Sequence, residues 1–308
     1  MGAFRLLPAR RIGLAVLMVL CAIGCDRTPQ DRSPKYGTEP SSRNIRTYSF
    51  AVHPLHNPSK MYEAYQPLIS WLNRMDRDVH FDLESSRDYA NFEDKFRARK
   101  PAFLLPNPWQ TLEAGKAGYA VIAMAGEPRD FKGIFLVRRD SGIRIPADLK
   151  GKAVSYPSHT ALAACIMPQY FLHRHGVNVM KDIENRYVGS QESSIMNAYM
   201  KHTAAAATWP TPWRAFQREH PSEAAEMKLV WETATLINNS VMARDDVPGS
   251  VRERVRASLL GLHETPEGRT ILKGMETARF LPASDADYEI VRDFVARFEE
   301  EVRPVERK

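Results

Sequence analysis

The stretch from Lys152 to Phe171, KAVSYPSHTALAACIMPQYF, begins like a β-strand and ends like an α-helix. Between the two parts stand Ser158, His159 and Thr160, three hydrogen-bonding side chains at the point where the helix would start. A strand followed directly by a helix is the unit from which parallel sheets are built. The stretch therefore predicts an α/β fold, and it raises the question of what these three side chains hold.

The same alternation of strands and helices extends over most of the chain. Short apolar runs predict strands at residues 48–52, 79–83, 102–105, 119–125, 134–137, 152–155, 186–188, 203–207, 229–232 and 239–243. Helical patterns lie between them, including residues 59–75, which Pro67 interrupts near the start, and only helices are expected after residue 243. This order predicts mainly parallel sheets with helices on both faces, in which ligands bind beyond the carboxyl ends of the strands.

The first residues indicate export from the cytoplasm. Three arginines and no acidic residue precede or flank the apolar run of residues 12–23, which is too short for an ordinary membrane span. The run ends in Ala-Ile-Gly-Cys at residues 22–25, which resembles a bacterial lipobox. We expect a signal peptide over residues 1–24 and a lipid on Cys25 that holds the protein at the periplasmic face of the cell membrane. A plain secretory signal is the alternative.

Composition limits what the rest of the chain can be. Residues 25–45 are polar and proline-rich, so they predict a flexible tether. The remaining chain is long enough for two lobes of ordinary domain size. The net charge of +6 is spread without a basic block, which argues against nucleic acid as a partner. Loss of Cys21 with the signal and lipidation of Cys25 would leave Cys165 as the last thiol, so the fold must rest on its core.

Four segments resemble a known family. Residues 145–154 read IPADLKGKAV and, with the hydroxyl-rich turn after them, resemble the entry to the second lobe of type II solute-binding proteins. The segments YQPLISWL at 65–72, SQE at 190–192 and FLPASDADY at 280–288 are similar to the phosphate/phosphite/phosphonate-binding family of ABC importers. The resemblance extends over residues 48–298. It implies two α/β lobes, joined by two crossing strands, that close on a ligand, with no enzymatic activity and no cofactor.

The family's architecture can be carried over onto this chain. It implies a lobe one of residues 46–135 and 240–308 and a lobe two of residues 136–239, with crossings at residues 131–138 and 236–244. Closure of the lobes would be a hinge motion. We expect a monomer that passes its ligand to an ABC permease. A membrane sensor that receives the ligand is an alternative partner, because both roles need the same cleft.

The resemblance implies that the turn in the opening stretch binds an anion. The family opens this helix with Ser-Thr-Ser-Gly, and this chain has Ser158-His159-Thr160-Ala161, which keeps two hydroxyls. Unpaired N–H groups and the helix dipole favour an anion at a helix start. The simpler alternatives are that Ser158 or Thr160 caps the helix and that His159 points to solvent.

Other candidate ligand residues follow predicted strands and should face the same cleft. They are His53, Asn107, Trp109, Gln191 and Trp209. Asn107 can donate to an oxyanion, whereas Trp109 and Trp209 are either pocket walls or packing residues. The resemblance implies that these residues and the turn bind a small oxyanion of the phosphate, phosphite or phosphonate class.

One absence bears on the ligand. Relatives that bind aminophosphonates carry an aspartate in the segment that matches residues 203–207, and this chain has Ala204 or Ala205 there. A buried ammonium without a partner is costly, which disfavours 2-aminoethylphosphonate. Glu192 is a possible substitute partner.

Two other kinds of site are weaker hypotheses. A hydrolase would use Ser155 or Ser158 with a histidine, but the sequence has no Gly-x-Ser-x-Gly elbow. A metal site would use the pair His53 and His56 or the pair His173 and His175, and no second Cys/His pair completes a tetrahedral set.

Overall fold

The computed structural model describes residues 45–55 and 58–305. The predicted signal peptide, Cys25, the tether up to residue 44, and His56 lie outside the described residues. Within the described part, no helix combines the length and the apolar character that crossing a bilayer requires.

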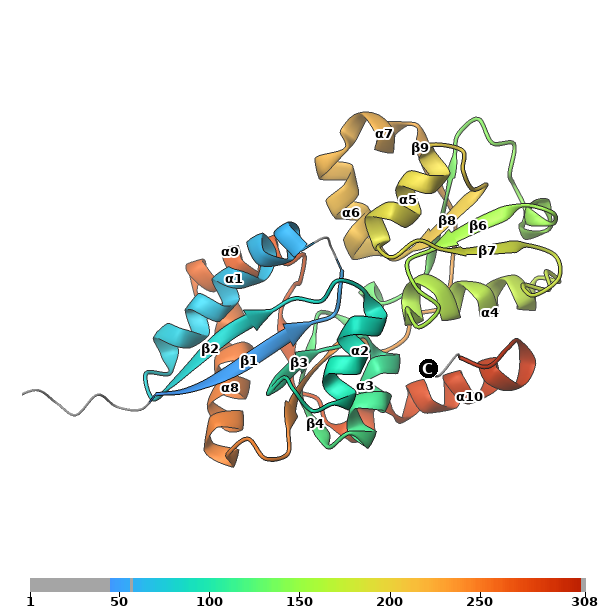
Figure 1. Ribbon diagram of the computed structural model, residues 1–308. Helices are drawn as coiled ribbons and strands as arrows, with labels where there is room; N and C mark the ends of the chain where they lie inside the picture. Colours follow the sequence, from blue (N-terminus) through green and yellow to red (C-terminus); the bar gives the residue numbers. More distant parts are fainter. Residues whose placement is uncertain (1–44, 56–57, 306–308) are drawn as a thin grey trace, which may run out of the picture. The chain divides into compact units, whose positions relative to one another are not determined.

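The strands form two separate sheets, each with its own helices (Figure 1). The first sheet has the order β11-β4-β10-β3-β1-β2. Its strands are β1 (Arg46–Val52), β2 (Val79–Glu84), β3 (Phe103–Leu105), β4 (Tyr119–Ala125), β10 (Ser240–Arg244) and β11 (Phe280–Leu281). The strand β1 pairs in parallel with β2 and β3, whereas β10 runs antiparallel between β3 and β4.

The second sheet has the order β7-β6-β8-β5-β9. Its strands are β5 (Ile134–Arg138), β6 (Ala153–Tyr156), β7 (Glu184–Tyr187), β8 (Ala205–Thr208) and β9 (Met227–Glu232). Here β6 pairs in parallel with β7 and β8, and β5 runs antiparallel to β8 and β9. The chain thus changes sheets between β4 and β5 and again between β9 and β10. We call the first sheet with its helices lobe one, and the second sheet with its helices lobe two.

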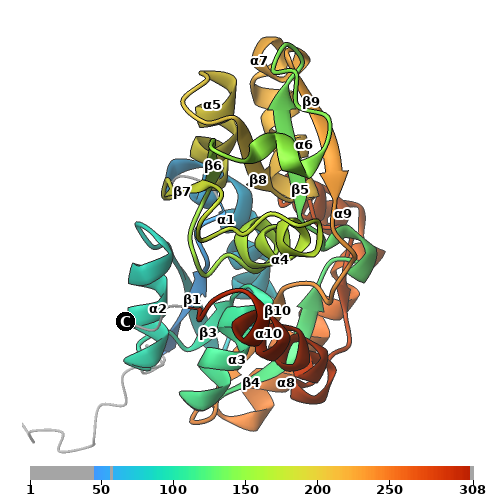
Figure 2. The same cartoon turned by 90° about the vertical axis from the view of Figure 1, so that its right-hand side faces the viewer.

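Helices cover both sheets. Lobe one has α1 (Pro58–Met75), α2 (Tyr89–Arg97), α3 (Pro108–Lys116), α8 (Gly249–Gly261), α9 (Pro266–Gly274) and α10 (Glu289–Glu301). Lobe two has α4 (Met167–Arg174), α5 (Gln191–Tyr199), α6 (Pro210–Glu219) and α7 (Pro221–Ala225). The helix α10 also lies beside α4 (Figure 2). The rings of Tyr170 on α4 and Phe294 on α10 pack edge to face there, with centroids 5.3 Å apart.

The predicted two-lobed α/β fold is confirmed, with three local differences. The helix α1 passes through Pro67 without a break, so the predicted interruption is wrong. The expectation of helices alone after residue 243 is also wrong, because Phe280 and Leu281 add the edge strand β11 to β4. The strand predicted at residues 186–188 begins earlier, at Glu184.

Two segments carry the chain from one lobe to the other, and they hydrogen-bond to each other. The amide of Leu236 donates to the carbonyl of Phe131 at 2.9 Å, and the amide of Thr233 donates to the carbonyl of Gly133 at 2.9 Å. The pair of segments is therefore a double connection of the kind about which lobes can hinge.

Candidate functional site

The helix after β6 begins at Leu162, beyond the polar turn of Ser158, His159 and Thr160. Ala161 is the N-cap, no side chain caps it, and the first turn, Leu162–Ile166, is a π-helix that continues into α4. The interpretation of Ser158 or Thr160 as the helix cap is therefore wrong. Ser158 Oγ instead lies 3.3 Å from the backbone N–H of Thr160, which donates to it within the turn.

Pro168 explains the wide first turn. A proline inside a helix lacks the N–H that would bond four residues back, and its ring presses on that carbonyl. The turn before it widens, so that the amide of Ile166 bonds to the carbonyl of Ala161 five residues back at 3.1 Å. Gly133 makes room for this turn, because a Cβ there would lie 2.6 Å from the Ala163 carbonyl oxygen. The turn is thus held against the segment that connects the lobes.

A small cavity lies at this helix start. Its volume is about 10 Å³, comparable to the space of one water molecule. Both lobes line it: His53, Tyr89, Asn107, Phe131 and Asn239 on one side, and Ala161, Leu162, Ala163, Ala164, Gln191 and Trp209 on the other. The N–H groups of a first helical turn have no partner within the helix, so this wall offers hydrogen-bond donors and the positive end of the dipole.

Of the eight predicted ligand residues, the cavity brings together His53, Asn107, Gln191 and Trp209. Gln191 joins the two lobes, since its Nε2 donates to the hydroxyl of Tyr89 at 3.1 Å while its Oε1 accepts from Thr208 at 2.8 Å. Burial raises the pKa of Tyr89, so this phenol stays neutral and keeps its hydrogen.

Asn107 and His53 are held in place by the backbone. The Asn107 side chain caps α3 by accepting from the amides of Trp109 and Gln110, and its Nδ2 donates to the carbonyl of Thr160 at 3.2 Å. Nδ1 of His53 lies 2.8 Å from the carbonyl oxygen of Leu105. The Asn107 bond also crosses between the lobes, so it fixes the start of α3 relative to the turn of Ser158, His159 and Thr160.

The two tryptophans differ in position. Trp209 lines the cavity and packs against Phe131 with ring centroids 5.6 Å apart. Trp109 is 3% exposed in the core of lobe one and does not line the cavity. Of the two interpretations offered by the sequence for Trp109, the structure places it as a packing residue.

Ser158, His159 and Thr160 stand just outside the cavity wall. The hydroxyls of Ser158 and Thr160 lie 3.1 Å apart, and Thr160 donates to the carboxylate of Glu93 at 2.6 Å. His159 packs edge to face on Tyr187, with ring centroids 5.8 Å apart, and its carbonyl accepts from Arg303 at 3.3 Å. The Thr160 hydroxyl of lobe two therefore donates its hydrogen bond to Glu93 of lobe one.

Sequence reasoning missed several buried polar residues at this site. They are Tyr89, Glu93, Gln110, Asn239 and Arg303. Glu93 lies on the same helical face as the apolar side chains of Tyr89, Phe92 and Phe96. An acid on an apolar face is the feature of the sequence that could have indicated a buried, functional carboxyl group.

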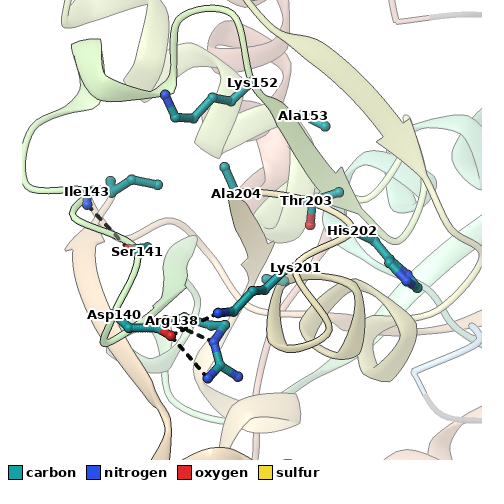
Figure 3. A pocket seen from close by; sticks show the side chains of 11 residues that line it. Arg138, Asp140, Ser141, Ile143, Lys152, Ala153, Lys201, His202, Thr203 and Ala204 are labelled. Carbon is teal, nitrogen blue, oxygen red and sulfur yellow. Dashed lines mark hydrogen bonds and ion pairs between the residues drawn. The ribbon is translucent and has the colours of Figure 1, made fainter.

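A different and larger cavity, of about 400 Å³, lies in lobe two, and Figure 3 shows the side chains that line it. Three of its charged side chains pair with one another, since Asp140 accepts from Arg138 at 3.0 Å and from Lys201 at 3.0 Å. These pairs hold the pKa of Asp140 down at about 2. The side chains of Asp140 and Lys201 are also more than half exposed to solvent. We therefore do not assign the binding site to this cavity on the basis of its size.

The geometry gives no support to the hydrolase hypothesis or to the metal-site hypothesis. Ser155 donates to the backbone carbonyl of Ser194 at 2.8 Å, and the closest non-backbone partner of its oxygen is Thr203 at 3.0 Å. Among the described residues, one group of three potential metal ligands occurs, Glu192, Glu219 and His220. Lys60 lies between its two carboxylates, so Glu192 is already paired with a cation.

Comparison with known proteins identifies the family and the fold. Residues 50–288 match the family described as "ABC transporter, phosphonate, periplasmic substrate-binding protein". A probable ABC transporter phosphite binding protein, PhnD1 of Prochlorococcus marinus, is 22% identical over 186 residues, which are 56% of this chain and 63% of that protein. The chain thus spans somewhat less than two thirds of the length of this relative.

Two solved structures share the fold. PhnD1 of Prochlorococcus marinus, solved in complex with methylphosphonate, has a TM-score of 0.77 at 17% identity, with 83% of this chain and 99% of that chain covered. A binding protein component of an ABC phosphonate transporter from Pseudomonas aeruginosa has a TM-score of 0.76 at 14% identity, covering 84% and 88%. The expectation of a binding protein in place of an enzyme is confirmed. The chain belongs to the family of periplasmic substrate-binding proteins of phosphonate ABC transporters.

Proposed function

We propose that the protein captures a small oxyanion of the phosphonate, phosphite or phosphate class between its lobes and delivers it to an ABC permease. The observation that carries this proposal is the cavity between the lobes. Its lining brings together the backbone amides of Leu162, Ala163 and Ala164 in the first helical turn, the neutral phenol of Tyr89 and the side-chain amide of Gln191. Such a set supplies several donors without a cation, which suits an oxyanion held by helix-dipole and hydrogen-bond interactions.

Binding requires the lobes to separate first. A cavity of about 10 Å³ is far too small for a phosphonate, and Asn107 and Gln191 close it by bonds that cross the lobe boundary. We propose lobe limits of 46–135 with 240–308 and of 136–239, and a hinge at the paired segments around Phe131 and Leu236. We further propose that a signal peptide exports the chain, that Cys25 carries the lipid anchor, and that the body acts as a monomer outside the cytoplasm.

A thermal-shift screen tests this function. Methylphosphonate, phosphite, phosphate, sulfate and divalent metal ions are added one at a time to the tether-plus-body protein purified without its signal. A ligand that binds only the native state raises the melting temperature, by an amount that grows with ligand concentration. Stabilisation by a phosphorus oxyanion is expected. Stabilisation by a metal ion alone would refute the proposal.

A further inference from the structure

Glu93 is an acid buried beside the turn that faces the proposed anion. Its side chain on α2 is 5% exposed, and Oε1 accepts hydrogen bonds from the Thr160 hydroxyl at 2.6 Å and from Gln110 Nε2 at 3.1 Å. Burial raises the pKa of this carboxyl, while the two hydrogen bonds and Arg97 oppose the rise. An ionised carboxylate at this position repels a bound anion and takes a donor from it.

A second acceptor faces the cavity itself. Asn239 is 3% exposed and lines the cavity, and its Oδ1 accepts no hydrogen bond from the part of the chain that the structure describes. A buried amide oxygen without a donor is costly, so in this orientation Asn239 favours a ligand that carries a hydrogen, whereas the amide turned by 180° would donate from Nδ2. A fully deprotonated oxyanion has acceptors only.

We propose that the site binds its oxyanion together with one proton, and that Glu93 makes it select oxyanions that carry a dissociable proton. This inference rests on the proposed function and names its substrate subclass. A hydrogen phosphonate, hydrogen phosphite or hydrogen phosphate brings the proton on one of its own oxygens and can offer it to an acceptor such as Asn239. Sulfate brings none at neutral pH, so it binds well only when Glu93 takes a proton from solvent.

Other charged and titratable groups surround Glu93. On α2 itself, Arg97 lies 3.6 Å from Glu93 Oε2, and Asp94 is the neighbouring acid. His53, after β1, packs its ring on Tyr89. His159 belongs to the turn, and Arg303 donates to its carbonyl. Both arginines keep their charge at every pH used below. A variant at Glu93 therefore separates its contribution from those of the two histidines.

Titration calorimetry with methylphosphonate and with sulfate at pH 6 and pH 8 tests the proposal. The proteins are the wild type, Glu93→Gln and Asp94→Asn. The glutamine keeps an oxygen that can accept from Thr160 but has no charge. The asparagine removes the same charge from an exposed position on the same helix and is the matched control.

The wild type should bind sulfate more weakly at pH 8 than at pH 6 by about tenfold or more, since one linked proton changes affinity by up to tenfold per pH unit. Glu93→Gln should bind sulfate about tenfold or more tightly than the wild type at pH 8, and its sulfate affinity should barely change with pH. Asp94→Asn should behave as the wild type. Equal sulfate affinity and equal pH dependence in Glu93→Gln and the wild type would overturn the proposal.

A measurement on the wild type alone guards against a variant that fails to fold. Methylphosphonate is titrated at pH 8 in buffers with different ionisation enthalpies, which counts the protons taken up on binding. Uptake of close to one proton for the dianion supports the proposal, and uptake of none overturns it. Binding of methylphosphonate with no effect of Glu93 would refute this inference alone, whereas a wild type that binds no oxyanion would refute the proposed function.

Discussion

Lys60 Nζ on α1 lies 2.8 Å from the Glu192 carboxylate on α5, so an ion pair joins lobe one to lobe two. Glu219 on α6 adds a second carboxylate 2.6 Å from the same ammonium. Burial by itself would lower the pKa of Lys60. The hydrogen bonds and charge interactions with the two carboxylates raise this pKa, and the net shift is upward. Each side chain keeps about a quarter to a third of its surface exposed, so water and salt reach the pairs. Such contacts favour closure without making it irreversible.

Lys60→Met should weaken oxyanion binding by favouring the open form. Partly exposed ion pairs contribute about 1 kcal/mol, which corresponds to roughly a fivefold loss of affinity. Raising the salt concentration should weaken binding by the wild type more than binding by Lys60→Met, because the variant has lost one of the sets of ion pairs that salt screens. Lys100→Met, an exposed lysine of the same lobe, is the control. Equal salt dependence in all three proteins would show that the pair does not assist closure.

Glu276 forms a second ionic contact between the lobes, in which the acid belongs to lobe one and the cations belong to lobe two. This residue of lobe one pairs with Arg214 and Arg218 on α6, and its φ of 52° is in the left-handed region that favours glycine. Glu276→Gln should weaken both pairs and keep the backbone strain, whereas Glu276→Gly should lose the pairs and relieve it. Both should reduce oxyanion affinity, and the glycine variant should be more stable than the glutamine variant by about 0.5–1 kcal/mol in urea unfolding. A less stable glycine variant would contradict this reasoning.

Glu93 should make stability depend on pH with a definite sign. Its pKa in the folded protein is raised, so between the ordinary carboxyl value and the raised value the folded state binds more protons than the unfolded state. The free energy of unfolding therefore contains a contribution that is present at low pH and lost as pH rises through the folded pKa. Urea unfolding should show that Glu93→Gln gains stability relative to the wild type between pH 5 and pH 8. A constant difference between the two proteins would contradict the raised pKa.

The anchor is tested by Cys25→Ser in the full chain. The variant should fold and bind as the wild type does, but it should leave the membrane fraction because serine lacks the thiol that would carry the lipid anchor. Fractionation after a high-salt wash measures this, with a lipoprotein of the same cell as the control. A variant that stays with the membrane would show that something other than a lipid on residue 25 holds the protein.

Most strands followed from apolar periodicity, whereas the division into two lobes followed from the family resemblance and the length of the chain. The exceptions have physical reasons. The strand β11 has two residues, too few for a pattern, and forms through its pairing with β4. Pro67 stays inside α1, where packing of the helix against β2 and α9 outweighs the lost hydrogen bond.

The site was harder to predict than the fold. The sequence predicted backbone N–H donors at a helix start but placed that start at Ser158–Thr160, whereas the first helical turn is Leu162–Ile166. Glu93 meets Thr160 only because the two lobes come together. Contacts between residues 67 positions apart depend on tertiary structure and leave no local pattern.

Calorimetric titration of the wild-type protein with methylphosphonate, beside Tyr89→Phe, tests whether the cavity between the lobes is the oxyanion site. The wild type should bind one ligand per chain with a Kd of about 1 μM or below. The lost phenol should weaken binding about tenfold or more, since hydrogen bonds to charged groups contribute about 1.5–3 kcal/mol. No binding of methylphosphonate, phosphite or phosphate at about 1 mM, or full affinity in Tyr89→Phe, would contradict an oxyanion site at the start of the Leu162–Ile166 turn.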